Sequence, residues 1–487
     1  MRTVLTELSD RARLAAATAT PRARELAVLH VLDTMGCVAA GADHPVAATL
    51  ATFLGEPFPP AAGGERFLGK PAGGGERFLG GLFSPAAGGE WSLRTAVLVE
   101  ATLAHVDEFD GFHPQAAVVP AAVVVPAALL TAAREGRDGA AVVDAVLAGY
   151  EAVVEAGLRF GGSALYTAWW PTALFGALGS AAAAAGVLGL DEERTRTALA
   201  LAAAGLGGLL TADEFGEGHY LLAGRAAADG VDAAYLARAG ARASLTLLDG
   251  PATAALGRAA GPESAREGVH LERCAFKAYP CARPLHAVVA AVTQLAAAGV
   301  PLGDAVAVRV RLPAVLLRFV NASTQPPGPA EAAASAAFAV IAAIRGRADD
   351  VRFYRSADLG EGPHPEITME ADPALDRHLP DHWAAGITVT LQDGRQFHHD
   401  VHDLTDDHGT TAKSADLTGD HATTAKSDDH ATTAKSGDHA TTAKSGDHAT
   451  IAKFAKLTGG ADPGPWLRLD THPAPGDLHD ALLGQGA

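Results

Sequence analysis

Residues 173–188 read ALFGALGSAAAAAGVL, a run without charged residues in which alanine and glycine predominate. Alanine has the highest helix propensity and loses no side-chain entropy on folding, so this segment predicts a helix. The small residues Gly176, Gly179 and Ala183 indicate that neighbouring helices approach it closely. Further helices are expected at residues 22–40, 96–106, 140–155 and 192–205. The first 275 residues therefore predict a large helical body.

The length and composition of the chain limit the kinds of protein that it can be. A chain of 487 residues is longer than a single hydrophobic core usually accommodates. We therefore expect two domains, or one large domain with an insertion. The hydrophobic fraction is 48% but the aromatic fraction only 6%, which favours helices packed through small side chains. The net charge of −18 and the pI near 5.5 argue against nucleic acid as a partner, because its phosphates would be repelled.

The cysteines and the N-terminal residues indicate a cytoplasmic protein. Cys37, Cys274 and Cys281 are an odd, sparse set, which predicts no disulfide framework and fits a reducing compartment. Residues 1–10 carry acidic groups where a signal peptide would need an apolar run. Residues 115–133 are almost entirely apolar, but prolines recur within them and alanine is only weakly hydrophobic. We interpret them as a buried helical segment and not as a membrane span.

The sequence pattern changes near residue 276. Strands are expected at residues 305–312, 386–391 and 396–401, where apolar and polar residues alternate. The last two strands flank Asp393-Gly394, a hairpin turn signal. Helices are expected at residues 286–298 and 330–344. Residues 276–405 therefore predict a smaller α+β domain, and the fold class is mainly α.

Two segments of low complexity interrupt the chain. Residues 63–89 repeat Gly-Glu-Arg-Phe-Leu-Gly and predict an irregular loop grown by duplication. Residues 406–447 repeat Asp-His-Ala-Thr-Thr-Ala-Lys-Ser-Gly, lack large apolar residues and predict a disordered loop. Metal storage by the Asp-His pairs is an alternative, although a nine-residue spacing turns successive histidines to opposite sides of a helix. The last copy continues into residues 451–457, a candidate ordered helix.

The first polar cluster is HVDEFDGFHP at residues 105–114. Two histidines and three carboxylates stand between an alanine-rich helix and an apolar run, which suggests a site for acid–base chemistry. Such residues also bind metals, but the spacing lacks a His pair at i, i+4 or cysteine partners, so no metal site is predicted. The alternative is an acidic helix end closed by a capping turn.

The second cluster extends from Lys277 to His286 and contains Tyr279, Cys281 and Arg283. Lysine is otherwise nearly absent before residue 413. Its ammonium is a compact charge, so Lys277 is a candidate for polarising a substrate carboxylate. At about 4 Å that attraction is on the order of 4 kcal/mol at an effective dielectric constant near 20. The alternatives are a surface lysine and a Cys281 thiolate beside His286 acting as a nucleophile.

The third cluster is DEFGEGHY at residues 213–220, which opens a helix that carries Arg225. Helix N-termini favour bound anions, so His219 and Arg225 are candidate ligand-facing groups. A capped loop with no ligand is the alternative.

In their order along the chain, these clusters resemble the MmgE/PrpD family, which contains 2-methylcitrate dehydratase, cis-aconitate decarboxylase and related epimerases. The matching stretches include residues 31–36, 104–110, 149–151 and 276–286, together with His113-Pro114, Pro171-Thr172, Ala223-Gly224 and Lys453-Phe454. The resemblance covers nearly the whole chain apart from the two repeat regions.

The resemblance implies an all-helical domain of residues 1–275, completed by about residues 448–487, and a lid of residues 276–405, with the active site between them. It implies a homodimeric lyase or isomerase that acts on a small carboxylate without a metal or an organic cofactor. Lys277 and His113 would hold the carboxylate, while Glu108 or Asp110 and His219 would act as acid and base. The substrate pocket would be shaped by His286, Tyr279, Arg225, Trp170, Thr172 and Cys281.

The chain departs from the family pattern at several positions that handle protons. Glu108-Phe109-Asp110-Gly111 stands where the family usually has Asp-Phe-Asp-Asp. Trp170 replaces a histidine, His219 a lysine, and Phe338 a tyrosine. These departures imply either a less charged substrate or a catalytically silent homologue that binds a ligand or partner in the same cleft.

Overall fold

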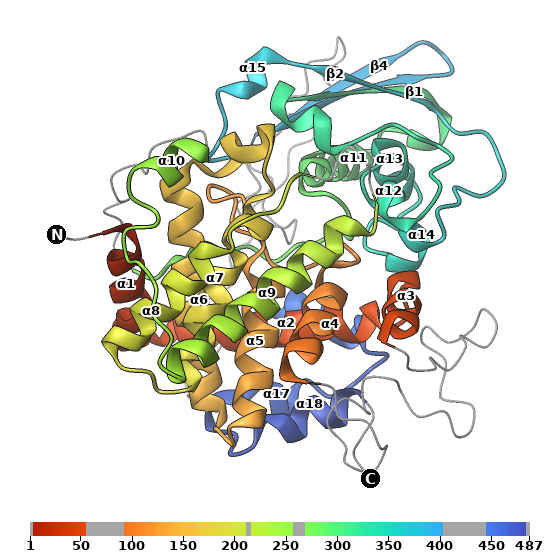
Figure 1. Cartoon of the computed structure of the whole chain (residues 1–487). Helices are drawn as coiled ribbons and strands as arrows, with labels where there is room; N and C mark the ends of the chain where they lie inside the picture. Colours follow the sequence, from red (N-terminus) through yellow and green to blue (C-terminus); the bar gives the residue numbers. More distant parts are fainter. Residues whose placement is uncertain (1–2, 55–91, 211–215, 257–267, 403–444, 484–487) are drawn as a thin grey trace, which may run out of the picture.

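The computed structural model describes residues 3–54, 92–210, 216–256, 268–402 and 445–483. In these ranges the chain is mainly helical and carries a small mixed sheet in its C-terminal part, which confirms the predicted fold class (Figure 1). The helices of the N-terminal part are α1 (Val4–Thr18), α2 (Pro21–Gly41), α3 (Pro45–Leu54), α4 (Leu93–His105), α5 (Pro120–Arg134), α6 (Gly139–Phe160), α7 (Pro171–Val187), α8 (Glu192–Ala204), α9 (Gly218–Arg238) and α10 (Pro251–Ala255).

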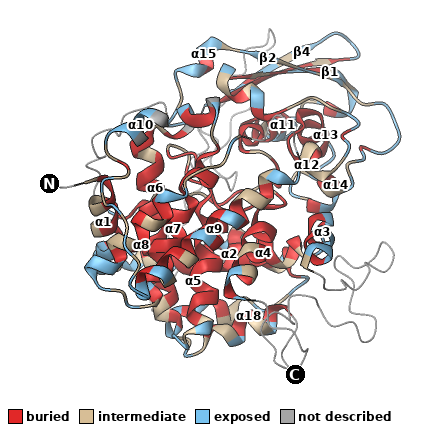
Figure 2. Ribbon diagram, viewed as in Figure 1, coloured by how far each residue is buried: buried red, intermediate tan, exposed pale blue. Residues whose placement is uncertain are grey.

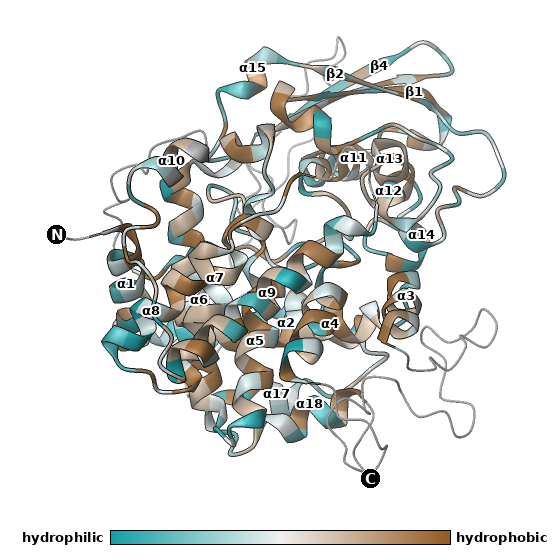
Figure 3. Cartoon of the chain, in the orientation of Figure 1, coloured by the Kyte–Doolittle hydropathy of each residue, from teal (hydrophilic) through white to brown (hydrophobic). Residues whose placement is uncertain are grey.

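Helix α7, formed by the alanine- and glycine-rich run near residues 173–188, lies inside the helical body between α6 and α9. Nearly all of its residues are buried (Figure 2), whereas outer helices such as α8 carry hydrophilic residues (Figure 3). A Cβ at Gly179 would lie 2.9 Å from the Val153 side chain, and one at Gly230 would lie 1.8 Å from Ser180 Oγ. Larger side chains at these positions would force the helices apart, which confirms the predicted close packing.

The apolar residues 115–133, interpreted from the sequence as a buried helical segment, are helical only from Pro120 onward. Proline is favoured at a helix start because its missing N–H would have no partner there, and it sets the boundary of α5. Residues 115–119 form a turn and a β-bridge instead. No single described helix is long and apolar enough to cross a membrane, although the pair α2 and α3, bent by 77°, meets these requirements jointly.

The sheet has the strand order β2-β1-β3-β4 and consists of β1 (Ala305–Leu312), β2 (Glu366–Ala371), β3 (Ala385–Leu391) and β4 (Gln396–Val401). Strands β3 and β4 form the predicted hairpin around Asp393-Gly394, and β3 pairs antiparallel with β1. Strand β2, which pairs parallel with β1, was not predicted. It alternates between half-buried and exposed residues at the sheet edge, so its sequence carries little apolar signal.

The part of the chain that carries the sheet also contains helices. They are α11 (His286–Ala297), α12 (Pro329–Ala333), α13 (Ala336–Ile344), α14 (Val351–Arg355) and α15 (Pro373–Asp376), and α11 contacts β3 and β4. The predicted helix over 330–344 is wrong as a single element, because the chain breaks at Ser335. The Ser335 hydroxyl accepts a hydrogen bond from Phe338 N at 3.3 Å and starts α13 afresh. Short 3₁₀ helices are η3 (Gly162–Thr167), η4 (His270–Arg273), η5 (Arg283–Leu285), η6 (Leu302–Asp304), η7 (Ala314–Phe319) and η8 (Leu469–Thr471).

The C-terminal helices return to the helical body (Figure 1). They are α16 (Ser445–Leu457), α17 (Gly464–Leu467) and α18 (Pro475–Leu483). Lys453 of α16 pairs with the buried Asp33 of α2 at 2.8 Å, and His479 of α18 pairs with the buried Glu100 of α4 at 2.6 Å. Helix α16 begins at Ser445, inside the segment 406–447 predicted to be disordered. The rest of that repeat and the repeat at 63–89 lie outside the described residues, and the domain boundaries stay predictions.

Candidate active site

A pocket of about 710 Å³, solvent included, is lined by residues from both parts of the chain. The helical body contributes His105, Glu108, Phe112, Tyr166, Trp170, Thr172, His219 and Tyr220, and later segments contribute Lys277, Arg283, Phe319 and Trp383, among others.

A β-bridge joins the first and second polar clusters. Phe112 and Ala275 exchange two backbone hydrogen bonds of 2.9 and 2.8 Å, which set the loop after α4 beside the segment that contains Lys277. Lys277 Nζ donates to Glu108 Oε2 at 2.8 Å and lies 3.8 Å from Asp110 Oδ1. The side chain of Lys277 is 1% exposed, so the ammonium faces inward and is not a surface group.

Helix α9 brings the third cluster to the same place. His219, in its first turn, has Nε2 3.1 Å from Glu108 Oε1 and 3.1 Å from His105 Nε2. The two oxygens of Glu108 are therefore bound by Lys277 and by His219. Behind them, His105 Nδ1 lies 3.0 Å from Asp110 Oδ1. Asp110 is fully buried and does not line the pocket, so it contacts His105 and not the cavity.

Burial and neighbouring charges shift the pKa values of His219 and His105 in opposite directions. Burial lowers the pKa of His219, and Glu108 offsets this only in part. Burial also acts to lower the pKa of His105, but the carboxylates of Asp110 and Glu108 outweigh it and raise that pKa. For Glu108, burial opposes ionisation, yet Lys277 and His105 hold its pKa well below the ordinary range. At neutral pH Glu108 is ionised and His219 is a neutral imidazole.

Glu108 has a left-handed backbone with φ of 51°, which is uncommon for a residue with a side chain. It sits in a tight turn in which its N–H donates to His105 O at 2.9 Å. Such conformations persist when the surroundings fix them, and they gather at functional sites. The contacts of the Glu108 side chain with Lys277 and His219 supply that constraint.

Aromatic rings form the apolar wall of the pocket. Trp170 is 5% exposed, stacks on His105 with ring centroids 5.0 Å apart, and lies 4.1 Å from the His219 ring. Thr172, two residues later, accepts a hydrogen bond from Val119 N at 3.0 Å. Its hydroxyl therefore fixes the start of α5 as well as lining the cavity.

Besides Asp110, five residues predicted for the site do not line the pocket: His113, His286, Tyr279, Cys281 and Arg225. His286 packs on the Tyr279 ring at 5.3 Å, and the Cys281 thiol interacts with Tyr354 of α14. Burial raises the pKa of Cys281 to about 12, which opposes the thiolate alternative. Arg225 is exposed, because six residues advance a helix by about 600° and turn it to another face from His219.

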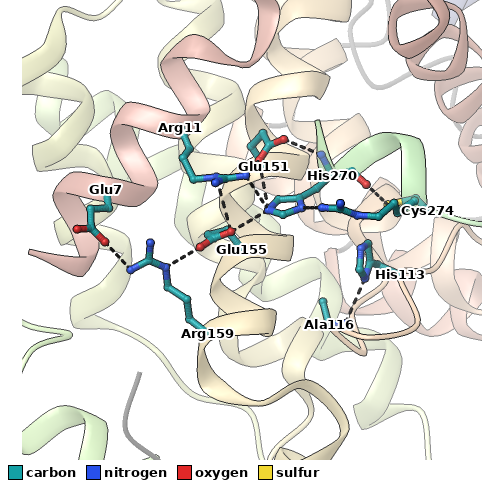
Figure 4. Close-up of polar contacts among 10 residues, drawn as sticks. Glu7, Arg11, His113, Ala116, Glu151, Glu155, Arg159, His270 and Cys274 are labelled. Atoms are coloured by element: carbon teal, nitrogen blue, oxygen red, sulfur yellow. Dashed lines mark hydrogen bonds and ion pairs between the residues drawn. The ribbon is translucent and has the colours of Figure 1, made fainter. Parts of the chain in front are cut away.

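His113 lies beside a second polar network that the sequence did not predict (Figure 4). Its Nδ1 accepts a hydrogen bond from Ala116 N at 3.1 Å, and its ring lies 6.3 Å from that of His270. The network joins α1, α6 and η4, and its members are Glu7, Arg11, Glu151, Glu155, Arg159 and His270. None of them lines the pocket.

Several pocket residues were missed by the sequence analysis. His105 stood in the first cluster but was not selected, although its position three residues before Glu108 is one helix turn. Arg283 was named in the second cluster without a role. No sequence pattern indicated the pocket residues Tyr166, Phe319 and Trp383. They come from 3₁₀ turns and a loop that only the tertiary fold brings together.

Three of the clustered side chains can hold a metal ion. They are His105, Glu108 and His219, each of which offers one donor atom. No metal site was predicted from the sequence, because the spacing of possible metal ligands was judged within each polar cluster separately. His219 reaches the first cluster only through the packing of α9 against α4.

Comparison with known proteins identifies one family. Residues 74–262 match the family model described as the MmgE/PrpD N-terminal domain. A search of curated proteins found no match. The matched range begins after α3 and contains α4 to α10, and so includes the first and third polar clusters. Residues 74–262 therefore correspond to the N-terminal domain of the MmgE/PrpD family, whose members are dehydratase- and decarboxylase-type enzymes.

Proposed function

We propose that this protein is a lyase or isomerase that removes a proton next to the carboxylate of a small molecule bound in the pocket. One observation carries the proposal. A buried ammonium, Lys277, is hydrogen-bonded to an ionised Glu108 whose other oxygen faces a neutral imidazole, His219. All three side chains line the same cavity.

The geometry supports separate roles for the charged groups. Glu108 stays ionised, so it orients Lys277 and His219 and is a poor proton donor, in contrast to its predicted role as an acid. His219 is neutral and can accept a proton from carbon. His105, with its raised pKa and its contact to Asp110, holds a proton behind His219. Two imidazoles with pKa values displaced in opposite directions form an acid–base pair.

The same arrangement accommodates the reaction classes of the family. In a dehydration, His219 would take the proton beside the carboxylate while the β-hydroxyl gains a proton and leaves as water. In an epimerisation a proton would be delivered to the same carbon from its opposite face. In both cases, the cations beside the carboxylate make the adjacent C–H more acidic, because they stabilise the charge that develops on the carboxylate.

The pocket favours a substrate with one carboxylate and an apolar part. Among the described lining residues the lysine and arginine side chains are Lys277 and Arg283, and Glu108 already neutralises the first. Arg283 is 7% exposed and brings a second side-chain cation to the pocket wall. The remaining wall is largely aromatic, with Trp170, Tyr166 and other rings. A tricarboxylate would have to bring two further negative charges into this buried site without partners.

The test is turnover of a panel of carboxylic acids followed by NMR. The panel contains 2- and 3-hydroxy acids with alkyl or aryl groups, together with citrate, methylcitrate and cis-aconitate. We expect conversion of a monocarboxylate by the wild type, and a kcat/KM lower by about 10²–10³-fold for Lys277→Met. Equal activity of wild type and Lys277→Met would contradict the proposal, provided that both have the same circular dichroism spectrum.

A second candidate function is a silent homologue that binds a ligand without converting it. Glu108 holds the Lys277 ammonium at 2.8 Å, which reduces the field available to polarise a substrate. Trp170 also presents an apolar ring at a pocket wall where the family pattern has a histidine. Saturable binding of a panel acid without any product, seen as ligand line broadening alone, would favour this alternative.

A further inference from the structure

Three donor atoms at the pocket wall form a nearly equilateral triangle. The distances are 3.1 Å between His105 Nε2 and His219 Nε2, 3.1 Å between His219 Nε2 and Glu108 Oε1, and 3.4 Å between His105 Nε2 and Glu108 Oε1. A tetrahedral zinc ion with bonds near 2.1 Å sets its ligand atoms about 3.4 Å apart. The triangle thus has the dimensions of one face of such a coordination sphere.

The same distances define where an ion would fit. A point equidistant from the corners of this triangle lies at least about 1.9 Å from each of them. Bonds of about 2.0–2.1 Å therefore place an ion slightly out of the plane of the three atoms. No donor has to move for this distance to be reached.

Hydrogen bonds can account for only some of the three close contacts in the triangle. Each Nε2 carries at most one hydrogen, and the ionised Glu108 carries none. At most two protons therefore serve three close contacts, and one pair of donor atoms stays in contact without a bridge. A cation that accepts a lone pair from each corner satisfies all three contacts together.

The groups behind the triangle also fit a metal site. His105 Nδ1 lies 3.0 Å from Asp110 Oδ1, so the carboxylate can hold the Nδ1–H and direct the Nε2 lone pair toward the triangle. Glu108 Oε2 is bound by Lys277, which leaves Oε1 for the ion. With two imidazoles and one carboxylate the donor set resembles His₂Glu zinc sites that keep a position open to substrate.

We propose that His105, Glu108 and His219 bind one divalent transition-metal ion, of which Zn²⁺ is the best probe, at the wall of the pocket. All three residues line the cavity, so the bound ion is accessible to a ligand. When bound, the ion would supply Lewis-acid polarisation of a substrate carboxylate or carbonyl oxygen. The inference concerns metal binding and holds whether or not the proposed reaction occurs.

The test measures Zn²⁺ binding by the full-length protein after treatment with a chelator, by equilibrium dialysis with metal analysis. We expect the wild type to bind one more Zn²⁺ per chain than His219→Asn, and Glu108→Gln to lose the same equivalent. Asp110→Asn should keep this equivalent but bind it about 10–100-fold more weakly, as found for changes behind metal ligands. Cobalt(II) should give visible absorption typical of a tetrahedral nitrogen and oxygen site with the wild type and not with His219→Asn.

The matched control is His399→Asn. His399 is a buried histidine of β4 whose Nε2 lies 2.6 Å from Gln294 Oε1, outside the pocket. This variant should bind as much Zn²⁺ as the wild type. All variants retain the Asp-His repeat, so any uptake there is common to them and cancels in the comparison.

Equal Zn²⁺ stoichiometry and affinity for the wild type, His219→Asn and Glu108→Gln would overturn the assignment. Displacement of the bound Zn²⁺ by excess Mg²⁺ would also overturn it, because imidazole ligands select against Mg²⁺. Circular dichroism shows whether each variant is folded. Because two different ligand residues are substituted, the test still works if one of the two variants fails to fold. Zn²⁺ binding together with no turnover by the metal-free protein would leave this inference standing and remove the proposed reaction. Turnover by the metal-free protein without any Zn²⁺ binding would do the reverse.

Discussion

The pocket cluster and the network of Figure 4 are built from the same kinds of residue. In each, a buried histidine lies between two carboxylates, His105 between Asp110 and Glu108, and His270 between Glu151 and Glu155. Each also contains cations. Sequence composition therefore does not tell these two regions apart.

Their surroundings separate them. In the network, Arg159 donates to Glu155 at 2.7 Å and to Glu7 at 2.6 Å, so planar guanidinium groups bind α1 to α6. In the pocket cluster a lysine takes the place of arginine, Glu108 has a left-handed backbone, and the groups border a cavity. The comparison teaches that a strained backbone and access to a cavity indicate a buried polar cluster with a catalytic role. Charges paired within packed helices indicate a cluster that stabilises the fold.

The largest expected effect is on stability, in the network. Glu155→Ala removes the partner of Arg159 and His270 in a fully buried position, which should lower the free energy of unfolding by about 3–5 kcal/mol. The kcat/KM of the folded fraction should stay unchanged. Urea unfolding and steady-state kinetics measure the two quantities. Glu192→Ala is the control, because the pairs that this exposed carboxylate forms with Arg13 and Arg196 should each contribute less than about 1 kcal/mol.

The converse change is at Lys277. Lys277→Met keeps the volume of the side chain but removes the charge that stabilises the substrate, so kcat/KM should fall by about 10²–10³-fold. Lys456→Met removes an exposed lysine paired with Asp349 and should leave kcat/KM unchanged. If Glu155→Ala lowered kcat/KM as much as Lys277→Met did, the distinction between the two regions would be wrong.

The two regions should also respond differently to acid. Burial opposes ionisation of Glu155, but His270 and Arg159 lower its pKa from 4.5 to about 2. A lowered pKa stabilises the fold above the unfolded value, so this contribution is complete above pH 4.5 and is lost as the pH falls toward 2. The pKa of His219 is lowered from 6.5, so activity should fall with its protonation below that pH. Profiles of Tm and kcat/KM against pH measure both, and Glu155→Gln should flatten only the acid limb of Tm.

The sequence predicted the helical body well because its signals are local. Alanine-rich segments with glycine-rich turns gave the helices, and the hairpin at Asp393-Gly394 gave β3 and β4. Strand β2 and the break at Ser335 were missed, because an edge strand and a cap inside an apolar run leave a weak pattern. At the site, Lys277, Glu108 and His219 were predicted as candidates, but their mutual contacts depend on the Phe112–Ala275 bridge and on α9, which no local pattern shows.

The smallest expected effect is at Arg225, where sequence and structure disagree. The sequence placed Arg225 with His219 at the ligand because both belong to one cluster, whereas the helix turns it into solvent. A surface substitution without buried contacts usually changes free energies by less than about 0.5 kcal/mol, so Arg225→Ala should change kcat/KM by no more than about twofold. His219→Asn, six residues earlier on the same helix, should instead abolish most activity. A loss in Arg225→Ala comparable to that in His219→Asn, measured on the same substrate, would show that α9 presents a different face to the ligand.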